Sequence, residues 1–251
     1  MTSEPLHIRR RSLLIAIAAI IVAIIVWNIP ALDFLLYPFR LFVTFIHETA
    51  HGLTAILTGG QLINLTVYSS GAGVATTAGG ARWLILPAGY LGAALFGAVL
   101  FYLTNTIRRA RWISGALAIM MAIMALTYTN FLSTAWLVGL GFAAVLAVLA
   151  YKGSRELNLA VLNFLAVLTA LNAVVDLFSL VQYSNASMGE VRNDAAAFSA
   201  NVFPLIPPAV WAVCWAAIAV LMLGLAVWYS YGRRAKRHLD SAYNSIKDKA
   251  S

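Results

Sequence analysis

The stretch FLLYPFRLFVTFIHETAHGLTAILT, residues 34–58, joins a long apolar run to a set of regularly spaced polar side chains. These side chains recur three or four positions apart: Thr44, His47, His51, Thr54 and Thr58. This spacing places them on one face of an otherwise apolar helix. Imidazole groups inside a membrane are costly unless they face a bundle interior or a cavity. We therefore predict a membrane-embedded helix whose polar face lines an internal site.

The composition of the whole chain also indicates a membrane protein. Of its 251 residues, 62% are hydrophobic and 10% are charged, whereas soluble domains are about 45–50% apolar and about 25% charged. An ordinary soluble domain, a disordered chain and a disulfide scaffold are therefore excluded. The net charge of +8 does not indicate a nucleic-acid partner, because the basic residues flank the apolar runs, as they do in membrane proteins.

Seven apolar segments are each near the roughly 20 residues that cross about 30 Å of hydrocarbon. They are Leu13–Asn28, Phe34–Thr58, Trp83–Asn105, Trp112–Tyr128, Thr134–Tyr151, Leu157–Val181 and Leu205–Tyr231. We expect an all-α polytopic membrane protein with about six or seven transmembrane helices, built as a single domain over residues 1–232. Residues 233–251 form a basic tail, which we expect to lie beside the membrane and to bind anionic lipid.

The basic clusters conflict with a count of seven spans. The clusters from Arg108 onward are separated by two segments each and can share one side of the membrane. The cluster Arg9–Arg11 is three segments away from Arg108. It can join the others only if one early segment does not cross the bilayer.

The segment Gly59–Arg82 has the character of strands rather than of a helix. Leu62–Tyr68 and Gly73–Thr77 are rich in β-branched and aromatic residues, and Ser69–Ala72 between them supplies turn residues. This pattern predicts a small β-hairpin at about residues 61–79, inserted between two membrane helices. A surface loop with the same turn chemistry is the alternative interpretation.

Residues 47–51 read His-Glu-Thr-Ala-His, an H-E-x-x-H motif that contains two of the four histidines of the chain. Residues four apart on a helix lie on one face, so both imidazoles can bind one Zn²⁺ ion. Glu48 lies beside that face, where a carboxylate can accept a proton from a metal-bound water. A polar seam between helices is the alternative, but such a seam does not need a glutamate between its histidines.

A zinc site requires at least a third protein ligand, and we expect Asp176 to supply it. Thr169, Asn172, Asp176 and Ser179 recur three or four positions apart and form a second polar stripe, on a second apolar helix. Three ligands leave the fourth position open for catalysis. Asn172 is expected to orient the ligand or a substrate carbonyl, or else to bond a neighbouring helix. A buried acid bonded to another helix is the alternative for Asp176.

These features resemble one family. A membrane-embedded H-E-x-x-H helix, a glycine-rich hairpin and a distal intramembrane aspartate are similar to the site-2-protease-like zinc metalloproteases, in particular to the small bacterial branch without a PDZ domain. The likeness runs through four segments: Phe45–Gly60, Pro87–Gly92, Asn172–Asp176 and Asn193–Ala195. The resemblance implies that His47, His51 and Asp176 bind zinc and that Glu48 is the catalytic acid and base. It also implies a bacterial inner-membrane protein.

The chain departs from the family at the third ligand. Better-known members place Leu-Asp-Gly after a segment that contains asparagine and proline, whereas Asp176 is followed by Leu177 and no proline precedes it nearby. Asp194 and Glu156 therefore remain alternative third ligands.

Three classes of function fit these residues. The one we expect is an intramembrane zinc protease that cleaves peptide bonds of membrane-protein or peptide substrates within or beside the bilayer. A metal- or proton-coupled transporter would use the same side chains, although the sequence shows no convincing internal repeat of the kind frequent in transporters. A catalytically inactive scaffold would need His47 and His51 but not Glu48.

The hairpin suggests how a protease would hold its substrate. A transmembrane helix bonds its own amides and carbonyls, so a substrate must unwind before cleavage. We expect the unwound segment to pair with an exposed hairpin edge by strand addition, with Val74 as an edge residue that binds substrate.

Overall fold

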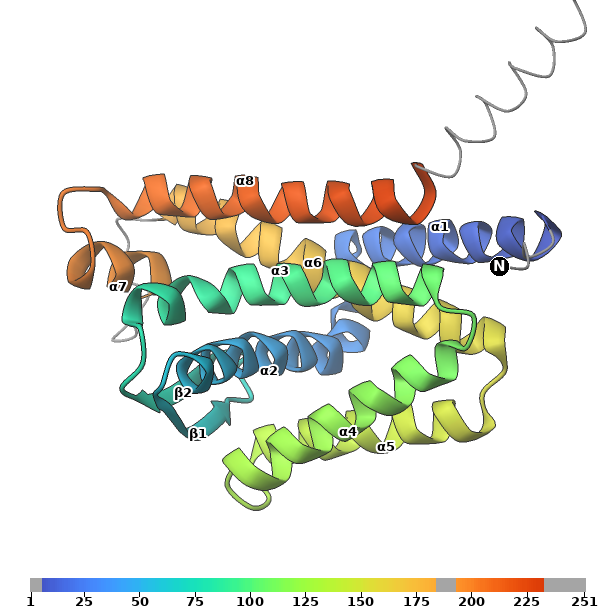
Figure 1. Cartoon of the computed structure of the whole chain (residues 1–251), viewed down its shortest axis with the longest axis horizontal. Coiled ribbons are helices and arrows are strands. Elements are labelled where there is room, and N and C mark those ends of the chain that lie inside the picture. The colour runs from blue at the N-terminus through green and yellow to red at the C-terminus, as the bar shows by residue number, and fades with distance from the viewer. Residues whose placement is uncertain (1–5, 184–192, 233–251) are drawn as a thin grey trace, which may run out of the picture.

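The structure, a computed structural model, describes residues 6–183 and 193–232. The predicted lipid-binding tail lies outside these residues. The described elements are α1 (Leu6–Asn28), η1 (Pro30–Leu32), α2 (Asp33–Leu57), β1 (Gln61–Val67), β2 (Gly73–Ala78), α3 (Arg82–Thr106), α4 (Ala110–Tyr128), α5 (Thr134–Lys152), α6 (Arg155–Tyr183), α7 (Asp194–Asn201), α8 (Pro208–Val227) and η2 (Trp228–Gly232). Figure 1 shows a bundle of long helices, with β1, β2 and α7 at one end, which we call the hairpin end.

The mostly helical fold is confirmed, and each predicted apolar segment contains a long helix. Five described helices are long and apolar enough to cross a bilayer: Arg82–Thr106, Ala110–Tyr128, Thr134–Lys152, Arg155–Phe178 and Pro208–Tyr231. The described apolar part of α1, Leu13–Val26, is shorter than a span. α2 is not in the set, and its run is interrupted by Asp33, Arg40 and Glu48. The expected count of six or seven spans is therefore not confirmed.

α1 and α2 run in the same direction rather than as an antiparallel pair. The short η1 helix joins them end to end, so that together they cover the long axis of the bundle once (Figure 1). We call the end of the bundle opposite the hairpin the basic end. It contains the start of α1, the α3–α4 connection, the α5–α6 connection and the end of η2. Across two of these connections, Arg155 Nε donates a hydrogen bond to the Arg108 carbonyl at 3.4 Å. Arg9–Arg11 therefore lies at the same end of the bundle as the basic clusters from Arg108 onward, and the conflict between these clusters and the number of spans is removed.

β1 and β2 form the predicted antiparallel hairpin, which packs along the polar face of α2. The Tyr37 hydroxyl donates a hydrogen bond to the Ser69 carbonyl at 2.9 Å. Further along α2, the Thr44 hydroxyl donates a hydrogen bond to the Gly71 carbonyl at 2.8 Å. These two bonds hold the turn of the hairpin against α2 and thereby fix the position of β2 relative to the H-E-x-x-H motif.

Small residues bring α3 close to α2 and α6. A Cβ atom added to Gly92 would lie 2.5 Å from the Ala50 Cβ, and one added to Gly97 would lie 2.7 Å from the Ala166 carbonyl oxygen. Both distances are too short for a side chain, so glycine permits the close approach of these helices. The first half of α3 is in this way packed against the turn of α2 that carries the motif.

Candidate metal centre

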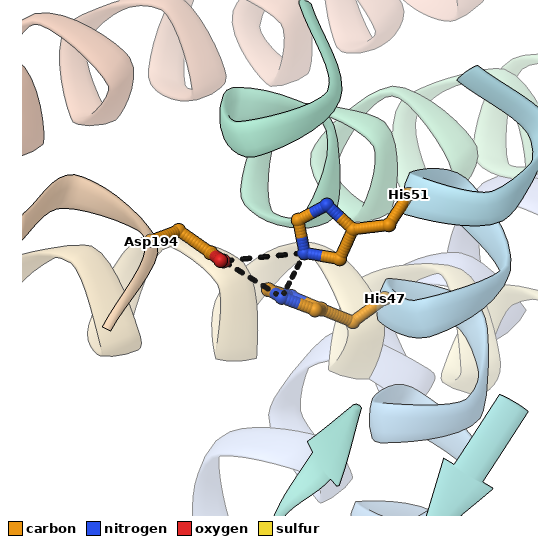
Figure 2. Close-up of side chains that lie close together, drawn as sticks. All are labelled: His47, His51 and Asp194. Atoms are coloured by element: carbon orange, nitrogen blue, oxygen red, sulfur yellow. Dashed lines mark hydrogen bonds and ion pairs between the residues drawn. The ribbon is translucent and has the colours of Figure 1, made fainter. Parts of the chain in front are cut away.

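Three potential ligand atoms converge at the hairpin end (Figure 2). His47 and His51 project from α2 one turn apart, and Asp194 is the first residue of α7. The two histidine Nε2 atoms are 3.1 Å apart, and each lies 3.2 Å from Asp194 Oδ2. Within residues 6–183 and 193–232, no other cluster of three or more His, Cys, Asp or Glu side chains has such ligand spacing.

Neighbouring groups fix the direction of these ligands. His51 Nδ1–H donates to the Ile85 carbonyl at 2.6 Å, which directs Nε2 at the centre. Asn193 caps α7, because its Oδ1 accepts a hydrogen bond from the Ala196 N–H at 2.8 Å, and the helix therefore begins at Asp194. The bond to Ile85 and the Asn193 cap thus direct His51 and Asp194 toward each other.

The two histidines favour the ionised form of the Asp194 carboxyl group. Burial by itself would raise the pKa of Asp194, but the charge of His51 and the hydrogen bonds with both histidines outweigh burial and lower this pKa below its usual range. An ionised carboxylate is the form that binds a metal ion.

Asp176, the expected third ligand, does not join the cluster. It lies on α6, where its Oδ2 accepts a hydrogen bond from Asn172 Nδ2 at 2.5 Å, and both side chains line the cavity that also exposes the two histidines. Glu156 is exposed in the first turn of α6, at the basic end. The aspartate that completes the cluster is Asp194, which the sequence offered only as an alternative. The structure therefore favours Asp194 over Asp176 as the third ligand.

A cavity of about 1050 Å³ lies over the centre. Its walls come from α2, β2, α3, α6 and α7, so the hairpin and the bundle enclose it together. The side chains of His47, His51 and Asp194 are 17%, 8% and 21% exposed. The centre is therefore shielded from bulk solvent but can be reached through the cavity.

Glu48 lies between the histidines and β2, and it is 5% exposed. The Ala75 backbone N–H donates a hydrogen bond to its carboxylate. A Cβ atom on Gly73 would lie 2.6 Å from Glu48 Oε1, so only glycine leaves room for the carboxylate at this point of the strand. The edge of β2 thus holds Glu48 beside the candidate metal centre.

The register of the hairpin changes one expectation. The Tyr68 N–H donates to the Ala72 carbonyl at 2.8 Å, and hydrogen-bonded pairs alternate along an antiparallel ladder. Val74 lies opposite Thr66, so its N–H is directed toward β1, while the Ala75 N–H is directed toward Glu48. Val74 lines the cavity, but its N–H does not lie on the free edge of β2 as we expected. The turn fixes the register so that the N–H of Val74 is directed toward β1.

Sequence reasoning assigned no role to Gly89 and Tyr90 of α3. A Cβ atom on Gly89 would collide with the Nε2 atoms of His47 and His51, so the backbone of α3 forms a wall of the centre. Tyr90 follows it and lines the cavity. The available signal was the sequence Pro87-Ala88-Gly89-Tyr90, which interrupts an apolar helix with a proline and a glycine.

Fold and centre together define a class: a helical protein with membrane-length helices, an H-E-x-x-H motif and a two-histidine, one-aspartate cluster of metal-binding type. The family described as Peptidase M50B-like matches residues 16–226, and the chain belongs to this family. Membership confirms the resemblance to site-2 proteases and makes the protein an integral membrane protein of a metallopeptidase family. Comparisons with curated proteins and with solved structures gave no match.

Proposed function

We propose that the protein is a hydrolase, an intramembrane zinc metalloprotease that cleaves peptide bonds of membrane-protein or peptide substrates within or beside the bilayer. The observation that carries this proposal is the convergence of two histidine Nε2 atoms and one aspartate Oδ2 atom next to the buried Glu48. A bacterial inner-membrane location is part of the same proposal.

The donor set suits a zinc ion. Catalytic zinc sites use three protein ligands of the imidazole and carboxylate type and keep a fourth position open. Ligand atoms on tetrahedral zinc are about 3.3 Å apart for bond lengths of about 2.0 Å, and the separations of 3.1 and 3.2 Å come close to this value. His47, His51 and Asp194 would hold the ion. Zinc bound there would supply Lewis acidity, which polarises a carbonyl group and acidifies water.

Glu48 would carry the proton transfers. It accepts a proton from the attacking water as the new O–C bond forms at the scissile carbonyl carbon. It then delivers that proton to the amine nitrogen as the C–N bond breaks. The hydrogen bond from the Ala75 N–H and the close contact with Gly73 keep the carboxylate in position for both steps.

The cavity supplies the substrate site in this proposal. Val74 of β2 and Asn172 of α6 both line it, and we assign both to substrate contact. The edge of β2 that faces the cavity supports strand addition at positions other than Ala75, whose N–H already donates to Glu48.

Metal content and peptide cleavage of the purified full-length protein test the proposal. We expect about one zinc ion per chain and cleavage of a fluorogenic peptide that contains an apolar transmembrane segment. Glu48→Gln should keep the zinc and lose cleavage, whereas the matched change Glu156→Gln, at an exposed glutamate of the basic end, should alter neither. A wild-type protein that binds zinc but transports an ion without cleaving peptide would favour a transporter instead.

A further inference from the structure

Tyr90 lines the cavity beside the candidate metal centre. Its ring lies edge-on to the His47 imidazole, with ring centroids 4.7 Å apart and planes at 84°. Trp215 of α8 stacks on the same tyrosine, with centroids 6.5 Å apart and planes at 28°. Contacts with two different helices therefore hold the Tyr90 ring in one orientation.

The Tyr90 hydroxyl has no hydrogen-bond partner among the residues that the structure describes. The Tyr90 side chain is half-buried. Tyr90 lines the same cavity as Asp194, Asp176 and Glu48. An O–H donor without a partner, held at the wall of a cavity, is available to a bound molecule.

Two other side-chain donors of the cavity are engaged, and a third is exposed. Asn172 donates to Asp176 at 2.5 Å, and the Thr44 hydroxyl donates to Gly71 at 2.8 Å. Arg82 is exposed at the first residue of α3. Among these side chains, Tyr90 alone packs directly on a histidine of the centre.

Peptide hydrolysis requires a donor at this place. Negative charge develops on the carbonyl oxygen as water attacks the carbonyl carbon, and one positioned donor to that oxygen is typically worth about 10²–10³ in rate. We propose that Tyr90 is a catalytic residue whose hydroxyl donates a hydrogen bond to the oxygen of the scissile carbonyl. Tyr90 keeps its proton throughout, since Glu48 performs the proton transfers. This inference rests on the proposed peptidase function.

The test is Tyr90→Phe, which removes the hydroxyl and keeps the ring against His47 and Trp215. We expect kcat for the fluorogenic peptide to fall by about 10²–10³, with KM changed less than about twofold. A second measurement needs no turnover. Binding of an N-phosphoryl dipeptide, whose tetrahedral phosphoryl group imitates the charged carbonyl oxygen, should weaken by a similar factor, while zinc content and Tm stay at wild-type values.

Tyr102→Phe is the matched control, because Tyr102 lies on the same helix and is 38% exposed. It should behave as the wild type in every measurement. Unchanged kcat and unchanged phosphoryl-dipeptide affinity in Tyr90→Phe would overturn the inference, as would loss of zinc from that variant. If the zinc-loaded wild type itself fails to cleave peptide, the proposed function is wrong, and this outcome is distinct from the others.

Discussion

Gly73→Ala tests whether the hairpin positions Glu48. A Cβ atom on Gly73 lies 2.6 Å from Glu48 Oε1 and 2.7 Å from Glu48 Cγ, whereas ordinary contacts begin at 3.4 Å. Either the carboxylate or β2 must therefore shift by about 0.8 Å, and both shifts weaken the hydrogen bond from the Ala75 N–H. Misplacing a catalytic group by about 1 Å can lower a rate about 100-fold, which corresponds to about 2.7 kcal/mol of transition-state stabilisation.

The assay measures kcat and zinc content of the full-length protein in detergent. We expect Gly73→Ala to lower kcat about 100-fold and to keep about one zinc ion per chain, because its Cβ does not meet the ligands. Gly141→Ala makes the same change where no atom lies within 4 Å and should have no effect. The new Cβ also lies 2.6 Å from Thr44 Cγ2, which Thr44→Ser removes. Recovery of activity in the double variant, or full activity in Gly73→Ala, would refute the reasoning.

Three further outcomes are expected for the metal centre. Gly89→Ala drives its Cβ into the Nε2 atoms of His47 and His51 and should weaken zinc binding about 10- to 100-fold, measured by competition with a chromophoric chelator. Asp194→Ala should leave the purified protein without stoichiometric zinc, whereas Asp176→Ala should retain it, and the reverse result would restore Asp176 as the ligand. Removal of zinc by a chelator should lower the Tm of the wild type by the equivalent of a few kcal/mol and leave the Tm of Asp194→Ala unchanged.

The helices and the hairpin could be predicted from the sequence because their signals are local. Apolar length and turn chemistry depend on neighbouring residues, and both identified their elements correctly. The relative direction of α1 and α2 could not be read in this way. Pro30 indicates an interruption, but whether the chain reverses or continues there depends on packing against α6 and the rest of the bundle.

In the candidate site too, the residues close together in the sequence could be predicted, and the distant one could not. His47, Glu48 and His51 share one turn of helix, so their spacing alone brings them together. Asp194 comes from a segment 143 residues beyond His51, and its only local signal is the Asn193 cap that starts a short helix. Asp176 had the clearer polar stripe, but the structure uses that stripe for a bond with Asn172 inside the cavity. A periodic pattern identifies the polar face of a helix, but the packing of the helices determines which residues that face contacts.

The distribution of charge along the bundle predicts its orientation. Eight of the ten lysines and arginines in the described residues belong to the basic end: Arg9, Arg10, Arg11, Arg108, Arg109, Arg111, Lys152 and Arg155. Lysine and arginine accumulate on the cytoplasmic side of membrane proteins. The basic end is therefore expected in the cytoplasm. The metal centre and its cavity, which lie at the hairpin end, are expected nearer the opposite face, where a substrate would be cut.

Cysteine labelling measures this orientation directly. The exposed Cys214 is first changed to serine, and single cysteines are then placed at Ser70 in the hairpin turn or at Ser154 in the α5–α6 connection, both exposed positions. In intact cells, a membrane-impermeant maleimide should label Ser70→Cys, and it should label Ser154→Cys only after the membrane is opened. The opposite pattern would place the centre toward the cytoplasm. It would mean that the hairpin end faces inward despite carrying few basic residues, so that charge does not govern the insertion of this bundle.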